Sequence, residues 1–145
     1  MEINFKRVHT VKDLILSAVI LAAGIGLYFI NIGLGVVIAA CGLLMLLLYK
    51  GGYKREGEDI VLCLKAMDLD HSCRTSLKDY LDGKDVEPLV NPSVRGGIIR
   101  LEVYCNAEAA VAYAQIFDFS NYTYEAATPL VELRGPRASR LINKL

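Results

Sequence analysis

Residues 14–49 read LILSAVILAAGIGLYFINIGLGVVIAACGLLMLLLY, and this stretch of 36 residues decides the fold. It contains no Asp, Glu, Lys, Arg or His. One straight helix of that length would measure about 54 Å at 1.5 Å per residue, whereas the hydrocarbon core of a bilayer is about 30 Å thick. The stretch therefore predicts two membrane-spanning helices that form a hairpin.

The turn of this hairpin is expected where Asn31, Gly33 and Gly35 interrupt the run of Leu, Ile, Val and Ala. Asn and Gly accept the left-handed backbone conformations that tight turns need. Division at this point gives spans at about 14–30 and 34–49. Each is near the lower limit of roughly 17 residues for a transmembrane helix.

Two other interpretations fit the stretch less well. A secretory signal peptide would continue into a polar sequence after its small-residue cleavage site, but Ala22, Ala23 and Gly24 are followed by more apolar residues. A hairpin buried in a soluble protein would need more covering sequence than the rest of the chain provides. The membrane hairpin is therefore favoured.

Three basic residues precede the first predicted span and three follow the second: Lys6, Arg7, Lys12, Lys50, Lys54 and Arg55. The predicted turn between the spans carries no charge. Because Lys and Arg favour the cytoplasmic side of a membrane, we expect both termini to be cytoplasmic. The membrane would be the plasma membrane, or the inner membrane in a bacterium.

Small residues recur at spacings of three or four in both spans: Ala18, Ala22, Gly26, Gly35, Ala39 and Gly42. Such a stripe lets another helix approach closely. The favoured interpretation is that the two helices pack on each other through these stripes. The alternative is that one stripe binds a second copy of the chain or another protein. Neither span contains an ionisable residue, and this argues against a transporter.

The predicted organisation has four parts: an N-terminal cytosolic segment at 1–13, the hairpin at 14–49, a linker at 50–57 and a small α+β domain at 58–145. Net charge is zero overall, and it divides into +2 for residues 1–50 and −2 for the remainder. A slightly acidic domain does not support nucleic-acid binding. The expected partners are the lipid bilayer and either another protein or a second copy of the chain.

Within the domain, the sequence predicts an antiparallel sheet with two helices. A strand is expected at 59–67, which is rich in apolar and β-branched residues, and another at 98–105, where apolar residues alternate with polar or aromatic ones. One helix should run from about Ser72 to Asp82, and a second should begin at Gly135-Pro136. This last helix is expected to dock on its own domain rather than on anionic lipid.

Residues 107–119 allow two interpretations. Their alanines favour a helix, whereas the alternation of Val111, Tyr113, Gln115 and Phe117 favours a strand. A β-hairpin with 98–105 is the favoured interpretation. Pro129 limits any further strand.

Aromatic residues are concentrated near the end of this region, and five of them are candidate interaction residues: Tyr113, Phe117, Phe119, Tyr122 and Tyr124. Some of them must belong to the core. Those that remain exposed suit a protein partner, since Tyr is enriched in interfaces.

The four cysteines are not arranged for zinc binding: Cys41, Cys63, Cys73 and Cys105. They are expected to be reduced thiols in the cytosol, and no metal or cofactor is predicted. His71 and Cys73 resemble a base and a nucleophile, but residues two apart do not face each other on a helix. A helix-capping turn is the favoured interpretation.

These features together predict a small integral membrane protein that acts as a non-enzymatic, membrane-tethered interaction or accessory module. One alternative is an oligomeric, channel-like or membrane-disrupting protein. Another is a membrane-anchored thiol enzyme that uses His71 and Cys73.

Overall fold

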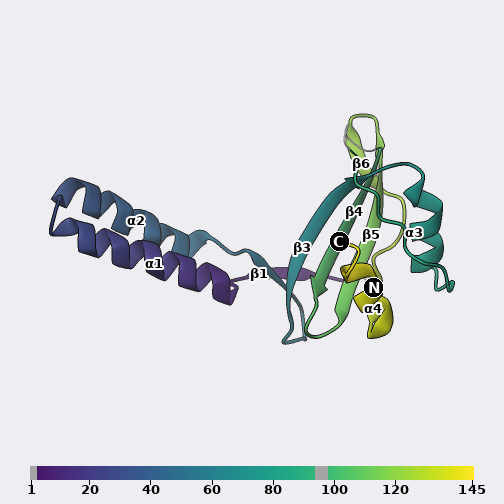
Figure 1. Ribbon diagram of the computed structural model, residues 1–145, viewed down its shortest axis with the longest axis horizontal. Helices are drawn as coiled ribbons and strands as arrows, with labels where there is room; N and C mark the ends of the chain where they lie inside the picture. The colour runs from purple at the N-terminus through teal and green to yellow at the C-terminus, as the bar shows by residue number, and fades with distance from the viewer. Residues whose placement is uncertain (1–2, 94–97) are drawn as a thin grey trace. The chain divides into compact units, whose positions relative to one another are not determined.

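The computed structural model describes residues 3–93 and 98–145, and the chain divides into two compact units (Figure 1). One unit is Asn4–Val61, which contains the helical hairpin, and the other contains Leu62–Leu145. The described residues form four helices and antiparallel strands. The predicted α+β class is therefore confirmed.

The hairpin consists of helix α1 (Val11–Tyr28) and helix α2 (Ile32–Leu48). Thr10 caps α1: its hydroxyl accepts a hydrogen bond from the Asp13 backbone at 3.2 Å, and the Asp13 carboxylate accepts one from the Thr10 backbone at 2.9 Å. Asn31 caps α2 by accepting from the backbone of Leu34 at 3.1 Å.

The turn lies earlier than the sequence predicts. It occupies Phe29–Asn31, so Gly33 and Gly35 lie inside α2 instead of in the connection. The reason is that Asn31 acts as an N-cap.

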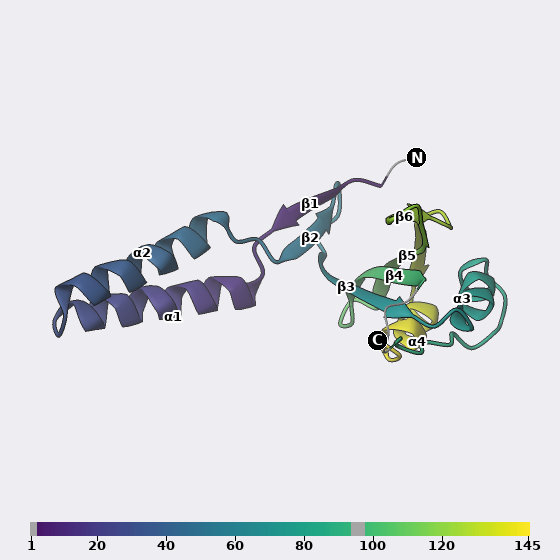
Figure 2. The same ribbon diagram turned by 90° about the horizontal axis from the view of Figure 1, so that it is seen from above.

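A short antiparallel ribbon continues from the open end of the hairpin (Figure 2). It pairs strand β1 (Phe5–Val8) with strand β2 (Gly52–Arg55). Strand β1 lies in the predicted N-terminal segment at 1–13, and β2 lies in the predicted linker at 50–57, where no strands were expected. Residues 1 and 2 of that segment lie outside the described residues.

The second unit is a sheet with two helices. Its strands are β3 (Val61–Leu69), β4 (Ile99–Asn106), β5 (Val111–Ser120), β6 (Thr123–Ala126) and β7 (Val131–Arg134), and its helices are α3 (Cys73–Leu81) and α4 (Pro136–Ile142). Strands β3, β4, β5 and β6 follow one another across the sheet, and β7 pairs with the other end of β5.

The favoured β-hairpin of residues 98–105 and 107–119 is confirmed, since β4 and β5 pair along their length. Strand β7 was not expected after Pro129. It forms because the chain turns back beside the first half of β5, which places Leu133 opposite Ala112.

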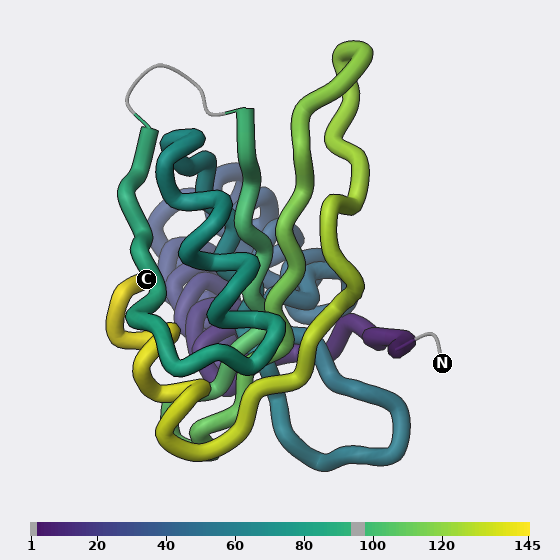
Figure 3. The backbone as a smooth tube through the Cα atoms, turned by 90° about the vertical axis from the view of Figure 1, so that its right-hand side faces the viewer, coloured from purple at the N-terminus to yellow at the C-terminus, as the bar shows by residue number. Residues whose placement is uncertain are grey.

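Helices α3 and α4 cover the same face of the sheet (Figures 2 and 3). Leu77 and Tyr80 of α3 and Leu141 of α4 pack in one buried cluster with Leu101 and Val103 of β4. All five side chains are fully or almost fully buried. This core belongs to the sheet unit alone.

Within the described residues, α1 is both long enough and apolar enough to cross a membrane, and little of it is buried. Helix α2 is also apolar and has 17 residues. The structure thus supports one candidate span near the N-terminus by length and composition.

Candidate functional site

The face of the sheet opposite α3 and α4 carries an ordered polar and aromatic cluster. The register puts Asp68 of β3 beside Arg100 of β4, and Arg100 beside Phe117 of β5. Arg100 Nε donates a hydrogen bond to Asp68 Oδ1 at 2.9 Å. This bond raises the pKa of the Arg100 guanidinium.

Tyr124 of β6 reaches the same cluster. The guanidinium carbon of Arg100 lies 4.0 Å from the centre of the Tyr124 ring, within the range of a cation–π contact. The Tyr124 hydroxyl lies 3.4 Å from Asp68 Oδ1. Arg100 is thus held between a carboxylate and an aromatic face, and its side chain remains about one-third exposed.

Aromatic side chains extend this cluster to the end of the β5–β6 hairpin, which projects from the sheet (Figure 3). Phe119 packs against Tyr124 with ring centres 5.1 Å apart and is 43% exposed. Tyr122 lies in the turn and is 94% exposed. We call Phe117, Phe119, Tyr122 and Tyr124 the aromatic surface.

The turn itself has unusual backbone geometry. Asn121 and Tyr122 have φ values of 50° and 63°, in the left-handed region. Asn tolerates this region, whereas a Tyr there is strained. The second position of such a hairpin turn is normally Gly.

Three of the predicted interaction residues are less accessible than Phe119 and Tyr122. Tyr113 is completely buried, and Phe117 and Tyr124 are half-buried. Tyr113 lies near the start of β5, between β4 and β7, where residues on both faces of the strand are buried. Tyr113 therefore cannot contact a partner directly, whereas the other four residues can.

Sequence reasoning did not find Asp68 and Arg100 as parts of this site. The predicted strand at 59–67 ends one residue before Asp68, and Arg100 is a polar residue of the alternating strand at 98–105. They are 32 positions apart, so only the register of β3 on β4 brings them together. The available sequence signal was the alternation in residues 98–105, which places Arg100 on the face of the strand opposite its apolar residues.

His71 and Cys73 are not brought together as a reactive pair. Cys73 is fully buried in the core, with its thiol 4.0 Å from the carbonyl oxygen of Asn91, whereas His71 is exposed. The Asp70 carboxylate accepts a hydrogen bond from the Ser72 backbone at 2.9 Å, which lowers the pKa of Asp70. This is the local turn chemistry expected before a helix.

Within the described residues, no three His, Cys, Asp or Glu side chains lie close enough to hold a metal ion. The four cysteines are free. One hollow on the described residues lies on the β1–β2 ribbon and another lies on the exposed side of α3, and neither of these is lined by His71 or Cys73.

The small residues of α2 lie on the face toward α1. A Cβ atom at Gly35 would lie 2.4 Å from the Tyr28 backbone, and one at Gly42 would lie 2.6 Å from the Leu21 backbone. Ala39 touches Gly24, which the sequence analysis did not select. Glycine is therefore needed where the helices cross closely.

The predicted stripe of α1 lies elsewhere: Ala18, Ala22 and Gly26 are exposed. A Cβ atom at Gly26 would meet no atom within 4 Å, whereas one at Gly24 would lie 2.3 Å from the Ala39 backbone. The face of α1 toward α2 instead contains Ser17 and Gly24. Ala18, Ala22 and Gly26 thus point away from the hairpin contact.

Comparisons with known proteins found no matching family model, no matching curated protein and no matching solved structure.

Proposed function

We propose that this protein is an integral membrane protein in which α1 and α2 both span the bilayer and hold an interaction domain at the cytoplasmic surface. The observation that carries this proposal is the apolar exterior of the hairpin. Of the 22 large hydrophobic side chains that are exposed among the described residues, 18 lie from Val11 to Tyr49. Soluble proteins rarely expose apolar surface of such extent.

The lengths of the helices agree with two spans. Helix α1 has 18 residues and α2 has 17, which corresponds to about 25–27 Å at 1.5 Å per residue. Tyr28 and Phe29 at the turn, and Tyr49 at the exit of α2, suit the two interfaces of the membrane. The Ser17 hydroxyl, buried inside the hairpin, donates to the Asp13 carbonyl at 2.8 Å.

The orientation rests on the basic residues that flank both helices at the open end of the hairpin, and on the uncharged turn at the other end. The test is a protease-sensitive tag after Leu145 in sealed, right-side-out vesicles. The tag should be protected until detergent is added. Cleavage in sealed vesicles would place the sheet domain outside and contradict the orientation.

The proposed role of the sheet domain is to bind a protein through the aromatic surface. Exposed Tyr and Phe beside an ordered Arg are typical of binding hot spots. Arg100 is already held in place by Asp68 and Tyr124, so little side-chain entropy is lost when a partner contacts it. A strained, exposed Tyr122 also agrees with a functional role.

Site-specific photo-crosslinking tests this role. Benzoylphenylalanine at position 122 should give a defined crosslinked species in the native membrane. The control places the same group at position 65, an exposed site on β3 that the register puts on the other face of the sheet. Equal crosslinking at both positions would show that the aromatic surface has no special role.

The outward position of Ala18, Ala22 and Gly26 supports a second candidate, an oligomeric and channel-like protein. In that case these residues would bind another copy. Gly26→Leu should then reduce the oligomer while leaving the α1–α2 contact intact, because the position is open. An unchanged oligomer size in mild detergent would remove this candidate.

A further inference from the structure

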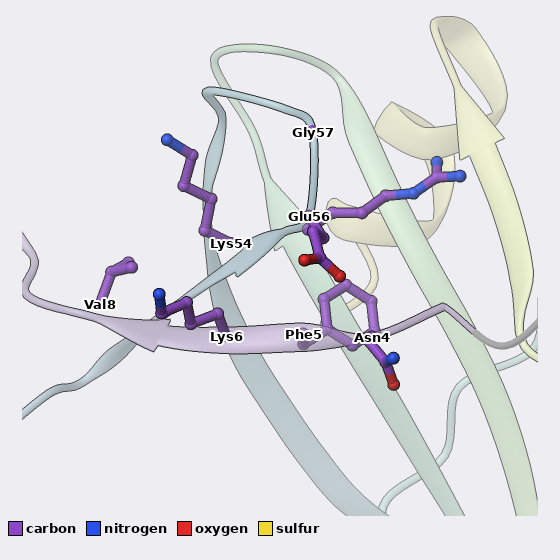
Figure 4. Close-up of a pocket in the computed structure, with 8 residues that line it drawn as sticks. Asn4, Phe5, Lys6, Val8, Lys54, Glu56 and Gly57 are labelled. Atoms are coloured by element: carbon purple, nitrogen blue, oxygen red, sulfur yellow. The ribbon is translucent and has the colours of Figure 1, made fainter.

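The β1–β2 ribbon carries a pair of lysines on one face. The register places Lys6 directly opposite Lys54, and both side chains extend to the same side of the ribbon (Figure 4). Like charges directly opposite each other on neighbouring strands destabilise the pair. An anion bound between the two ammonium groups would remove this repulsion.

Other positive charge surrounds this pair. Segments 4–12 and 50–57 contain six basic residues, and Glu56 is their one acidic residue. Among the described residues, Lys6, Lys12 and Lys50 form no ion pair. Lys54 lies 2.6 Å from Asp59, but that carboxylate is fully exposed, so the pair contributes little.

A hollow of about 500 Å³ lies on the ribbon between these charges. Its lining combines the cationic side chains of Lys6, Lys54 and Arg55 with the apolar side chains of Phe5 and Val8. The Glu56 carboxylate also lines the hollow, so the lining carries three basic groups against one acidic group (Figure 4). Cationic groups beside apolar ones suit an amphiphile, which has an anionic head next to a hydrocarbon part.

The ribbon is fixed at the open end of the hairpin. The Asp13 carboxylate accepts hydrogen bonds from the backbones of Thr10 and Gly51, both at 2.9 Å, and so joins the start of α1 to the chain after α2. Lys54 lies two residues beyond Gly52, about 7 Å at 3.3 Å per residue. The polar headgroup layer on each side of a bilayer is of similar thickness, roughly 5–7 Å.

We propose that the β1–β2 ribbon binds the headgroup phosphate of an anionic phospholipid between Lys6 and Lys54. This inference rests on the proposed membrane insertion of α1 and α2, which brings the ribbon to headgroup depth. The lipid phosphate neutralises the two facing ammonium groups, and Phe5 and Val8 contact the glycerol and upper acyl region.

The test uses the full-length protein in phosphatidylcholine vesicles that contain a trace of spin-labelled lipid. Electron paramagnetic resonance measures the fraction of label immobilised by the protein, for phosphatidylglycerol and for phosphatidylcholine. The double variant Lys6→Gln/Lys54→Gln should lower the preference for phosphatidylglycerol by fivefold or more, since each lysine near the surface contributes about a fivefold factor. The matched control is Lys65→Gln/Lys78→Gln, which removes the same charge from exposed positions of the sheet domain.

Equal losses in both double variants would indicate general charge attraction and overturn the site. Absence of any phosphatidylglycerol preference in the unaltered protein would also overturn it. Loss of the preference on adding soluble glycerol phosphate at an equal headgroup concentration would assign the site to a soluble phosphate instead.

Insertion is measured separately, by resistance to alkaline extraction from pure phosphatidylcholine vesicles. Extraction of the protein would contradict the proposed function and, with it, this inference. Resistance to extraction without lipid selectivity would contradict this inference alone.

Discussion

Tyr80 joins the two helices of the sheet domain. Its hydroxyl donates to the carbonyl oxygen of Arg137, and the Arg137 guanidinium donates to the Tyr80 carbonyl and lies 5.2 Å from the ring centre. Tyr80→Phe removes one hydrogen bond and should cost about 1 kcal/mol. For a domain of this size, Tm should fall by about 4–8 °C. Near-UV circular dichroism would follow the melting, with Tyr122→Phe as a surface control that leaves Tm unchanged.

The same residue predicts a loss of stability at alkaline pH. Burial raises the pKa of Tyr80 above 10.0. The folded domain therefore holds this proton more tightly than the unfolded chain does. The resulting stability is fully present below about pH 10 and is lost as pH rises through the raised pKa. Urea midpoints at about pH 8 and 10.5 should differ less for Tyr80→Phe than for the unaltered protein. If the urea midpoint fell equally between these pH values in Tyr80→Phe and in the unaltered protein, the alkaline loss of stability would not come from Tyr80.

The cysteines should differ in reactivity. Cys63 is exposed, whereas Cys73 and Cys105 are buried, and burial raises the pKa of the Cys105 thiol. Since the thiolate is the reactive form, a water-soluble maleimide should modify Cys63 first in native membranes. Cys41 lies in α2 and should be protected by lipid. Mass spectrometry of the labelled peptides would test this order, and Cys63→Ser should abolish the fast phase.

At the scale of the elements, the hairpin offers a matched pair of glycines in α1. Gly24→Ala places a Cβ atom 2.3 Å from the Ala39 backbone, whereas Gly26→Ala meets nothing within 4 Å. Both substitutions raise helix propensity by a similar amount, about 0.8–1 kcal/mol. Gly24→Ala should nevertheless lower the resistance of the hairpin to SDS, and Gly26→Ala should leave it equal or higher. Circular dichroism during an SDS titration measures the resistance of each variant. A hairpin that is more resistant with Gly24→Ala than with Gly26→Ala would refute the α1–α2 contact.

In the β5–β6 hairpin, one substitution is expected to raise the stability of the sheet domain. Tyr122→Gly removes a side chain from a position with φ of 63°, where Gly is not strained. The sheet domain should gain roughly 0.5–1 kcal/mol. Because the same change removes the most exposed aromatic residue, crosslinking of a partner from a probe at position 119 should decrease. Asn121→Gly is the control, since it changes the same turn but keeps the Tyr122 ring.

At the scale of the whole molecule, features that depend on local sequence were predictable. The apolar run predicts two helices, the alternation in residues 98–105 predicts β4, and Pro136 predicts the start of α4. Each of these signals lies within the element that it specifies. The aromatic surface was predictable in part for the same reason, since Phe119 and Tyr122 lie close together along the chain.

Features that depend on distant pairing were not predictable. Strands β1 and β2 are each four residues long, and β2 begins 44 positions after the end of β1, so neither has a periodic signal long enough to detect. The contact between Asp68 and Arg100 requires the register of β3 on β4. The face of α1 that meets α2 is set by Gly24, and Ala18, Ala22 and Gly26 form an equally regular stripe.

The division of the chain into two units predicts two separate unfolding transitions. The core of the sheet domain contains no residue of the hairpin, and separate cores need not unfold together. Helices α1 and α2 contain 18 and 17 residues against 9 and 7 in α3 and α4, so far-UV circular dichroism reports mainly the hairpin. In mild detergent, urea should abolish the near-UV signal of the sheet domain while most of the helical signal remains. Leu77→Ala, which creates a cavity in the core and costs about 2–5 kcal/mol, should shift the near-UV transition alone. Coincident transitions that both shift in this variant would show that the hairpin and the sheet domain unfold as one cooperative unit.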